Sequence, residues 1–364
     1  MEIKVDSRKV EKGDTFIALR GVDNDGHNYI NKAIENGASK IICEEGSYSV
    51  ETIVVKDTRE YLINYLNENY GDKINKLKII GITGTNGKTT SAYLFHEILN
   101  KIGKKCGYIG TIGFYINEKI RSLNNTTPDI YDLYELLLEC YDKNCEYVIM
   151  EVSSHGLANK RVESLKFDYA VFTNLTQDHL DFHKTMENYI AAKERIFENQ
   201  LSTDFMVLNI DDPIVADMKH RAPSHILEIS QHQVVSNGAY YDKGQCYVTK
   251  NGIATPVIGS ADIHILGSHN IENILTVIAL AYALGVPVET IHRIISEFHG
   301  VEHRLERVKT LDGITFYNDS KATNVDSVVK ALESFDQSVI LLAGGHDKMT
   351  PLEDFMQLVK HHTK

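Results

Sequence analysis

The fold of this chain is decided by the stretch ITGTNGKTT, which occupies residues 82–90. Before it, residues 77–82 are apolar and rich in β-branched side chains, as in a buried parallel strand. After it, residues 91–102 carry apolar side chains at helical spacing. A glycine-rich turn between such a strand and a helix N-terminus offers free backbone N–H groups, with about half a positive charge, to an anion. The stretch therefore predicts a phosphate-binding loop.

The loop departs from the strict G-x-x-x-x-G-K-[ST] pattern at one position, where Ile82 stands in place of the first glycine. We interpret it as a variant P-loop rather than an ordinary glycine turn, because a strand precedes it and a helix follows it. Lys88 is then expected to reach the β- and γ-phosphates of a nucleotide, and the Thr89 hydroxyl to ligate Mg²⁺. The residues of the loop predicted to bind ATP are Gly84, Thr85, Asn86, Gly87, Lys88, Thr89 and Thr90.

Composition limits the class of protein. A length of 364 residues suits two or three domains, and a net charge of −12 argues against a general surface for nucleic acid or anionic membrane. The five cysteines are odd in number and include no C-x-x-C pair, so neither a disulfide framework nor a zinc ribbon is indicated. The longest apolar run, residues 274–284, is too short to span a bilayer. We expect a cytoplasmic protein with no nucleic-acid or membrane partner.

The first two predicted domains differ in pattern. Residues 1–76 mix short strand-like pieces with one helical segment and end in a polar stretch, residues 67–76, which we expect to be a linker. Residues 77–300 alternate apolar strands with helical patterns, which predicts an α/β domain with a mostly parallel, helix-covered sheet. A polar insert in this second domain has hairpin character around Asn251 and Gly252.

A third predicted domain begins at residue 301. Strands are expected at residues 314–317 and 339–343, with a helix at 325–335 between them. Residues 301–364 are too few to complete an α/β domain of this kind, so we expect the third domain to be truncated.

Two polar residues follow predicted strands and suggest a metal site. Glu151 ends one buried strand, and His179 follows the next one along the chain. Because ligands of open α/β sheets lie outside the carboxyl ends of the strands, Glu151 could hold Mg²⁺ opposite Thr89, or it could be a strand-terminal acid facing solvent. His179 and His183 lack the glutamate of H-E-x-x-H, so we favour His179 as a ligand of a hard Mg²⁺ centre, with His183 as its support.

Lys193 falls on the apolar face of a predicted helix, four residues from both Tyr189 and Phe197. It is either a lysine that extends its amine to solvent or a functional lysine near the metal. The pattern alone leaves both interpretations open.

The last third holds further polar candidates. Asn270 and Asn273 lie at the start of a predicted helix and could present amides to a purine base, although asparagines there are more often caps. Arg304 and Lys321 are cations that suit a transferring phosphate, and Asp319 suits ribose hydroxyls.

Four segments together resemble one family. They are TGTNGKTT at residues 83–90, EVSSHGL at 151–157, FTNLTQDHLDFH at 172–183 and YIAAKERIF at 189–197. Their sequences and their order closely resemble the Mur ligases, the ATP-dependent peptide-bond-forming enzymes of bacterial cell-wall precursor synthesis. The resemblance covers essentially the whole chain. It implies a three-domain α/β architecture, with a central P-loop ATPase domain and a C-terminal Rossmann-like domain, and it favours a monomer.

The first 200 residues look most like the UDP-N-acetylmuramoyl-tripeptide synthetases. DSR at residues 6–8 and GVDNDGH at 21–27 match the UDP-binding N-domain of that type, and NTTPD at 125–129 matches its muramoyl-peptide loop. By this resemblance Ser7 contacts the uridine moiety. The residues implied to hold the peptide and sugar of the precursor are Thr126, Thr127, Ser153, Asn159 and Arg161, with Asn159 standing where the family often has glutamine.

The resemblance also assigns the chemistry. Lys193 becomes a carbamylated lysine whose carbamate bridges toward a second Mg²⁺. The implied metal ligands are Thr89, Glu151, His179 and the carbamate of Lys193. The implied catalytic residues are Lys88, Glu151, His179, Lys193, Arg304 and Lys321, and the implied ATP contacts outside the P-loop are Asn270, Asn273, Arg304 and Asp319.

The later segments NDSKATN at residues 318–324 and GGHDK at 344–348 look more like the D-glutamate-adding ligases of the same family. The function implied first is addition of a diamino acid to UDP-N-acetylmuramoyl-L-alanyl-D-glutamate through an acyl phosphate. One alternative is D-glutamate addition to UDP-N-acetylmuramoyl-L-alanine. The other is a non-catalytic fragment that binds the precursor.

Overall fold

The structure is a computed structural model that describes residues 3–21, 24–335, 337–345 and 353–363. Residues 22–23 of the GVDNDGH segment and 346–348 of the GGHDK segment therefore lie outside the described residues. The chain forms two compact units. The first unit comprises Met1–Leu77, Pro128–Asn144 and Lys160–Ser164, and the second comprises Lys78–Thr127, Cys145–Asn159 and Leu165–Lys364.

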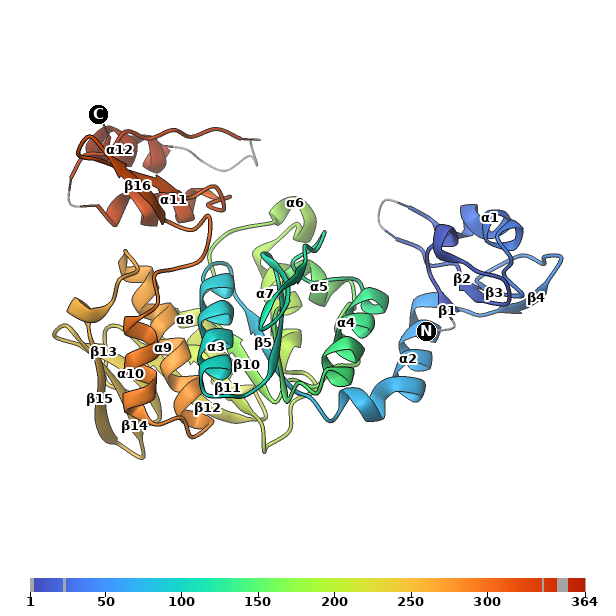
Figure 1. The fold of residues 1–364 in the computed structure, drawn as a ribbon, viewed down its shortest axis with the longest axis horizontal. Coiled ribbons are helices and arrows are strands. Elements are labelled where there is room, and N and C mark those ends of the chain that lie inside the picture. The colour runs from blue at the N-terminus through green and yellow to red at the C-terminus, as the bar shows by residue number, and fades with distance from the viewer. Residues whose placement is uncertain (1–2, 22–23, 336, 346–352, 364) are drawn as a thin grey trace. The chain divides into compact units, whose positions relative to one another are not determined.

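The first unit contains a four-stranded parallel sheet of order β1-β2-β3-β4. Its elements are β1 (Ile3–Lys4), β2 (Thr15–Ile17), α1 (Ile30–Glu35), β3 (Lys40–Cys43), β4 (Glu51–Val54), α2 (Thr58–Ile74) and α4 (Ile130–Asp142). Phe16, Ile30 and Ile41 are at most 1% exposed and belong to a small core to which α1 contributes. Figure 1 shows α1 beside the strands of this sheet. The predicted α/β character of this region is confirmed.

The predicted linker at residues 67–76 is wrong, because α2 continues to Ile74. Asp57 caps the helix by accepting from the N–H groups of Arg59 and Glu60. Leu62, Leu66 and Ile74 are buried on one face at helical spacing, and α2 packs against α4. Most residues between these positions are polar, so the sequence shows no clear apolar pattern for this helix, and its packing against α4 stabilises it.

The second unit is built on an eleven-stranded sheet of order β15-β14-β13-β12-β11-β10-β5-β9-β6-β7-β8. The strands are β5 (Lys78–Thr83), β6 (Cys106–Gly110), β7 (Gly113–Ile116), β8 (Glu118–Arg121), β9 (Tyr147–Glu151), β10 (Tyr169–Phe172), β11 (Phe205–Asn209), β12 (His225–Ser230), β13 (Gly238–Asp242), β14 (Gln245–Lys250) and β15 (Ile253–Gly259). The strands from β13 to β6 in this order are parallel, and antiparallel strands extend both ends. The mostly parallel sheet and the hairpin at Asn251–Gly252 are therefore confirmed.

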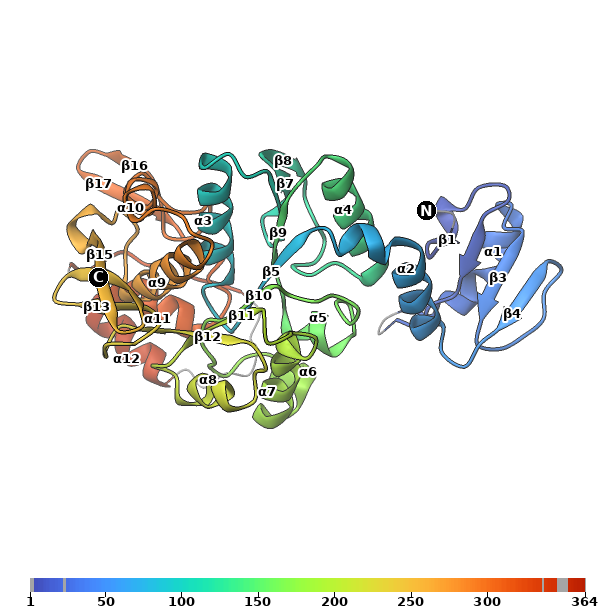
Figure 2. The same cartoon turned by 90° about the horizontal axis from the view of Figure 1, so that it is seen from below.

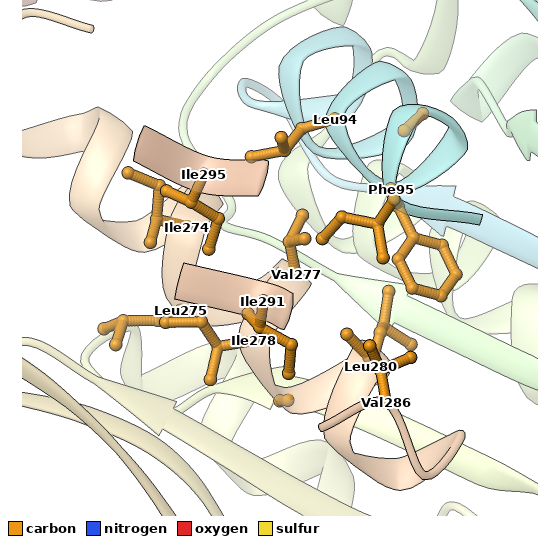
Figure 3. Packing of buried hydrophobic residues seen from close by; sticks show 14 of the residues in the cluster. Leu94, Phe95, Ile274, Leu275, Val277, Ile278, Leu280, Val286, Ile291 and Ile295 are labelled. Atoms are coloured by element: carbon orange, nitrogen blue, oxygen red, sulfur yellow. The ribbon is translucent and has the colours of Figure 1, made fainter. Parts of the chain in front are cut away.

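Helices cover both faces of this sheet. They are α3 (Lys88–Lys101), α5 (Ser154–Ala158), α6 (Leu180–His183), α7 (Met186–Glu194), α8 (Pro213–Asp217), α9 (Ser268–Ala283) and α10 (Val288–Ser296). Figure 2 shows α3, α9 and α10 on one face and α5, α7 and α8 on the other. Leu94 and Phe95 of α3 pack against apolar side chains of α9, with Ile291 and Ile295 of α10 beside them (Figure 3). This packing fixes the helix that follows the P-loop.

The remaining elements are β16 (Glu306–Leu311) and β17 (Ile314–Asn318), which form an antiparallel hairpin, and the helices α11 (Val325–Glu333) and α12 (Glu353–His362). The predicted strand at residues 339–343 is wrong. Within the described residues Val339 forms only an isolated bridge with Thr363, and Leu342 is 94% exposed. An apolar run forms a strand only where a neighbouring strand pairs with it.

Candidate active site

The predicted site lies at the carboxyl ends of four neighbouring parallel strands, whose order in the sheet is β10-β5-β9-β6. The P-loop follows β5, Glu151 ends β9, residues 173–179 follow β10, and Gly110 ends β6. Because the carboxyl ends of parallel strands meet at one edge of a sheet, segments far apart in the sequence come together here.

The two glycines of the P-loop are required by space as well as by conformation. Gly84 has φ of 133° and Gly87 has φ of 89°, both in the region that favours glycine. A Cβ atom on Gly84 would lie 2.0 Å from Thr173 Oγ1, and one on Gly87 would lie 2.3 Å from Asn273 Oδ1. The loop is therefore closely packed between the segment after β10 and helix α9.

The segment after β10 holds the loop in place. The N–H of Thr85 donates to the carbonyl oxygen of Asn174 at 2.9 Å, and the N–H of Asn86 donates to Asn174 Oδ1 at 2.9 Å. The Thr173 hydroxyl donates to the carbonyl oxygen of Asn86 at 2.6 Å. An α-helix leaves its first N–H groups without intrahelical partners, and α3 begins at Lys88. The start of α3 therefore lies directly after the loop, and the binding of an anion there stays a prediction.

Lys88 folds back over the loop. Its Nζ donates to the carbonyl oxygens of Gly84 and Thr85, each at 2.9 Å. Burial lowers the pKa of Lys88, and the negative charge of Glu151 opposes this shift. The amine therefore lies over the loop that the sequence predicts to hold phosphates.

Glu151 is fully buried, so it does not face solvent. The Thr89 hydroxyl donates to Glu151 Oε2 at 2.9 Å, and Arg304 Nη2 donates to Thr89 Oγ1 at 3.2 Å. A hydroxyl and a carboxylate are hard oxygen donors of the kind that Mg²⁺ takes together with nucleotide phosphates. Among the described residues, no three His, Cys, Asp or Glu side chains are grouped closely enough to hold a metal ion.

His179 lies at the start of α6 with φ of 52°, and its ring meets that of His155 edge-on at 4.7 Å between centroids. Its Nε2 lies 3.6 Å from Asp178 Oδ2. His183 is buried, and burial, followed by the nearby His155, lowers its pKa to about 4. His183 is thus a neutral ring near neutral pH, in keeping with a supporting role, and the role of His179 as a metal ligand stays a prediction.

Lys193 is only 1% exposed, so it does not extend to solvent. From α7 its Nζ donates to the carbonyl oxygen of Gly84 at 2.7 Å and lies 5.0 Å from the centroid of the Tyr189 ring. Burial lowers the pKa of Lys193 well below its ordinary value, and the charge of Lys88 adds to this effect. A buried amine with a lowered pKa, beside the predicted phosphate-binding loop, favours the functional interpretation of this lysine.

A cavity of about 280 Å³ lies beside the loop. The predicted ATP-binding residues that line it are Asn86, Gly87, Thr90, Asn270, Asn273, Arg304 and Asp319. Lys321 lies outside this lining, and its backbone N–H donates to the carbonyl oxygen of His303 at 3.2 Å. Asn270 and Asn273 are linked to each other, with Asn273 Nδ2 donating to Asn270 Oδ1 at 2.9 Å.

The sequence did not single out several residues of the cavity. His264 and His299 line it with their rings stacked at 5.0 Å between centroids, and Tyr317 and Lys330 line it as well. These four residues are far apart in the sequence: one precedes α9, one follows α10, and the other two belong to β17 and α11. No single motif can therefore contain them. Aromatic rings with nearby amides form a lining that suits a nucleoside next to its phosphates.

The residues predicted to hold a precursor are divided between the two units. In the second unit the Thr126 hydroxyl lies 3.0 Å from that of Thr111, and the Thr127 hydroxyl donates to the carbonyl oxygen of Glu151 at 2.9 Å. Ser153 caps α5, and Asn159 ends it. Ser7 and Arg161 belong to the first unit, where Ser7 is buried and Arg161 Nε lies 3.8 Å from Asp129 Oδ2.

Among the described residues, we find no helix with both the length and the apolar character needed to cross a membrane. All five cysteines are buried and are thiols rather than disulfides.

Comparison with known proteins identifies the family. A Mur ligase middle domain matches residues 82–281, and a Mur ligase family catalytic domain matches residues 2–70. A relative from Clostridium perfringens, named UDP-N-acetylmuramoyl-L-alanyl-D-glutamate--2,6-diaminopimelate ligase, is 40% identical over 81% of this chain and 62% of its own length. A relative from Thermoanaerobacter sp., named UDP-N-acetylmuramoylalanine--D-glutamate ligase, is 35% identical over 90% of this chain and 67% of its own length.

A solved structure of a UDP-N-acetylmuramoyl-L-alanyl-D-glutamate--2,6-diaminopimelate ligase is similar over 99% of this chain and 76% of that chain, with a TM-score of 0.76 and 26% identity. The chain spans about two thirds of the length of the curated relatives, 62% and 67% in the two named above. The matched domains cover both the P-loop region and the N-terminal region. The chain therefore belongs to the Mur ligase family.

Proposed function

We propose that this chain carries the ATP-dependent chemistry of a ligase that adds a diamino acid to UDP-N-acetylmuramoyl-L-alanyl-D-glutamate in peptidoglycan precursor synthesis. The observation that carries the proposal is the buried Thr89–Glu151 pair beside the P-loop. The substrate is taken from relatives named for this reaction, the first of them 40% identical. ATP, Mg²⁺ and the precursor are the proposed ligands.

The proposed ligase reaction has two steps. The terminal carboxylate of the precursor attacks the γ-phosphorus of ATP, which forms an acyl phosphate and releases ADP. The amine of the amino acid then attacks the acyl carbon, an amide bond forms, and phosphate leaves with a proton released from the amine. Lys88 and Arg304 would stabilise the charge that develops on the phosphoryl oxygens, with Lys321 as a further cation. Mg²⁺, held by Thr89, Glu151 and His179, would supply further neutralisation of the phosphate charge.

Lys193 is proposed to be carbamylated. Its amine is buried and its pKa is lowered, which favours the neutral form that can attack carbon dioxide. Attack forms an N–C bond, and the proton lost from nitrogen passes to solvent or buffer. The resulting carbamate anion is a hard oxygen ligand suited to a second Mg²⁺.

A second candidate function is D-glutamate addition to UDP-N-acetylmuramoyl-L-alanine. Its support is the NDSKATN segment and the relatives that bear this name, one of them 35% identical. A third possibility is a fragment that binds the precursor without turnover. We further propose that the protein acts as a monomer in the cytoplasm, and that it divides into domains at residues 1–76, 77–300 and 301–364.

Phosphate release from ATP tests the proposal. We would assay each UDP-muramoyl precursor separately with D-glutamate, L-lysine and diaminopimelate. Turnover with the dipeptide precursor and a diamino acid supports the first function, and turnover with the alanyl precursor and D-glutamate supports the second. Precursor binding without turnover supports the third.

Lys88→Ala should abolish phosphate release, because no other loop side chain supplies a cation to the phosphates. Lys101→Ala is the matched control at the exposed end of the same helix, where its ion pair with Glu297 is worth little. Wild-type turnover by Lys88→Ala would refute the assignment of the P-loop.

A further inference from the structure

We propose that the end of β6 and the turn that follows it form a bracket for Glu151, in which Tyr108, Gly110 and Thr111 fix the carboxylate in the orientation that a metal–nucleotide complex needs. Tyr108 and Thr111 are positioning residues in this proposal. It rests on the proposed role of Glu151 as a Mg²⁺ ligand and names the residues that prepare it for that role.

Both carboxylate oxygens of Glu151 receive donors from this bracket. The Tyr108 hydroxyl donates to Oε1 at 2.5 Å, and the backbone N–H of Thr111 donates to the same oxygen at 2.9 Å. The Thr111 hydroxyl donates to Oε2 at 3.1 Å, beside the Thr89 hydroxyl at 2.9 Å. Three donors therefore come from the bracket and one from the P-loop helix, which leaves a fully buried carboxylate with little freedom to rotate.

Gly110 supplies the space for this arrangement. A Cβ atom at this position would lie 2.4 Å from Glu151 Oε1 and 2.4 Å from the Tyr108 hydroxyl oxygen. Such an atom would occupy the place where the hydroxyl and the carboxylate meet. Gly110 is therefore needed because any larger residue would separate Tyr108 from Glu151.

Tyr108 is itself held firmly. Its ring is fully buried and meets those of Tyr93 and Tyr115 edge-on, at 6.0 Å and 5.5 Å between centroids. A tyrosine hydroxyl has an ordinary pKa of about 10, so it carries a proton near neutral pH and can donate it to Glu151 Oε1. A rigid ring with a permanent donor can hold one oxygen of Glu151 in one place.

Partners that orient a metal ligand contribute substantially to metal affinity, and their loss typically costs about 10-fold to 100-fold. Tyr108→Phe removes one donor and keeps the ring, so it should weaken metal binding without unfolding the protein. Tyr115→Phe is the matched control, since it removes a hydroxyl from the same aromatic cluster that does not contact Glu151.

The direct measurement is Mn²⁺ binding, followed by the electron paramagnetic resonance signal of free Mn²⁺, with a non-hydrolysable ATP analogue present. We expect the Mn²⁺ Kd of Tyr108→Phe to rise by about 10-fold and that of Tyr115→Phe to stay at the wild-type value. The Mg²⁺ concentration for half-maximal phosphate release should rise by a similar factor, while excess Mg²⁺ restores most of kcat.

Thr111 gives a second, independent variant. Thr111→Val removes the hydroxyl and keeps the backbone donor, and we expect it to raise the Mn²⁺ Kd. Thr111→Ser keeps both donors and should restore wild-type binding.

The proposal is overturned if Tyr108→Phe and Thr111→Val both bind Mn²⁺ like the wild type. Glu151→Gln separates this failure from failure of the proposed function. If Glu151→Gln weakens Mn²⁺ binding and the two bracket variants do not, only the bracket is wrong. If Glu151→Gln has no effect, Glu151 is not a metal ligand and both proposals fail.

Discussion

The amines of Lys88 and Lys193 meet at one atom, the carbonyl oxygen of Gly84, which accepts from their Nζ atoms at 2.9 Å and 2.7 Å. If both amines carried a proton, their charges would repel each other at this short separation. Burial lowers the pKa of both lysines, and the charge of Lys88 lowers that of Lys193 further. Conversion of Lys193 to an anion would turn this repulsion into attraction.

Carbamylation of Lys193 can be observed directly. In buffer containing ¹³C-bicarbonate, the wild-type protein should show a carbamate carbon resonance by NMR, because its buried neutral amine reacts with carbon dioxide. Lys193→Ala should lack the resonance and the ligase activity. Lys184→Ala is the control, since Lys184 is exposed and should not affect the resonance. A spectrum unchanged by Lys193→Ala would contradict the prediction.

The buried lysine also predicts a pH dependence of stability. Unfolded Lys193 is protonated at every pH below its ordinary pKa of 10.5, whereas the folded group stays neutral down to its lowered pKa. The unfolded state therefore binds more protons in this window, and the free energy of unfolding should rise with pH up to about 10.5. Urea unfolding in carbon-dioxide-free buffer should show a shallower rise for Lys193→Met. An equal rise in both proteins would show that Lys193 is protonated when folded.

Gly87→Ala should weaken ATP binding by at least about 10-fold, because the added Cβ meets Asn273 and the backbone has φ of 89°. Gly103→Ala is a matched control at the other end of the same helix, with φ of 78° and no atom within 4 Å of the added Cβ. Both variants should lose roughly 1–2 kcal/mol of stability from backbone strain. Only Gly87→Ala should change the ATP Kd, measured by isothermal titration calorimetry. Equal ATP affinity in the two variants would contradict the close packing of the loop.

His96 predicts a loss of stability in acid. The ring is fully buried among Tyr93, Tyr108 and Tyr115, and burial lowers its pKa to about 4. Between pH 6.5 and about 4 the unfolded state takes up a proton that the folded state does not, so stability falls as pH falls through this window. The difference corresponds to on the order of 3 kcal/mol.

His96→Phe should flatten this dependence in urea unfolding experiments at several pH values, because phenylalanine cannot take up the proton. The control His220→Gln changes an exposed ring and should keep the wild-type slope. A steep acid slope that persists in His96→Phe would show that other groups cause it.

Local pattern was sufficient for much of the site. The P-loop was predicted because strand, glycines, lysine and helix are contiguous, and Glu151 was predicted because it ends a buried strand. Spacing also placed Lys193 on the buried face of its helix with Tyr189. Only the position of Gly84, more than 100 residues away, distinguishes a functional lysine from one that extends to solvent.

What local pattern missed depends on pairing between distant strands. Tyr108 contacts Glu151 because β6 lies beside β9, and no spacing rule relates residues 43 positions apart. Helix α2 was not predicted because only a few of its residues are buried and polar residues stand between them. The apolar run at residues 339–343 was taken for a strand because sequence cannot show whether a partner strand is present.

The hydroxyl of Thr111 carries one proton, which sets a direction of donation through the site. Glu151 Oε2 can only accept while it is ionised, so Thr111 gives its proton to that oxygen and must itself accept from Thr126. The proton of Thr126 is then used in the contact with Thr111, so the Thr126 hydroxyl can only accept from any further group. A group that forms a hydrogen bond with the Thr126 hydroxyl would then need an N–H or an O–H of its own, so this hydroxyl favours a donor over a carboxylate or phosphate oxygen.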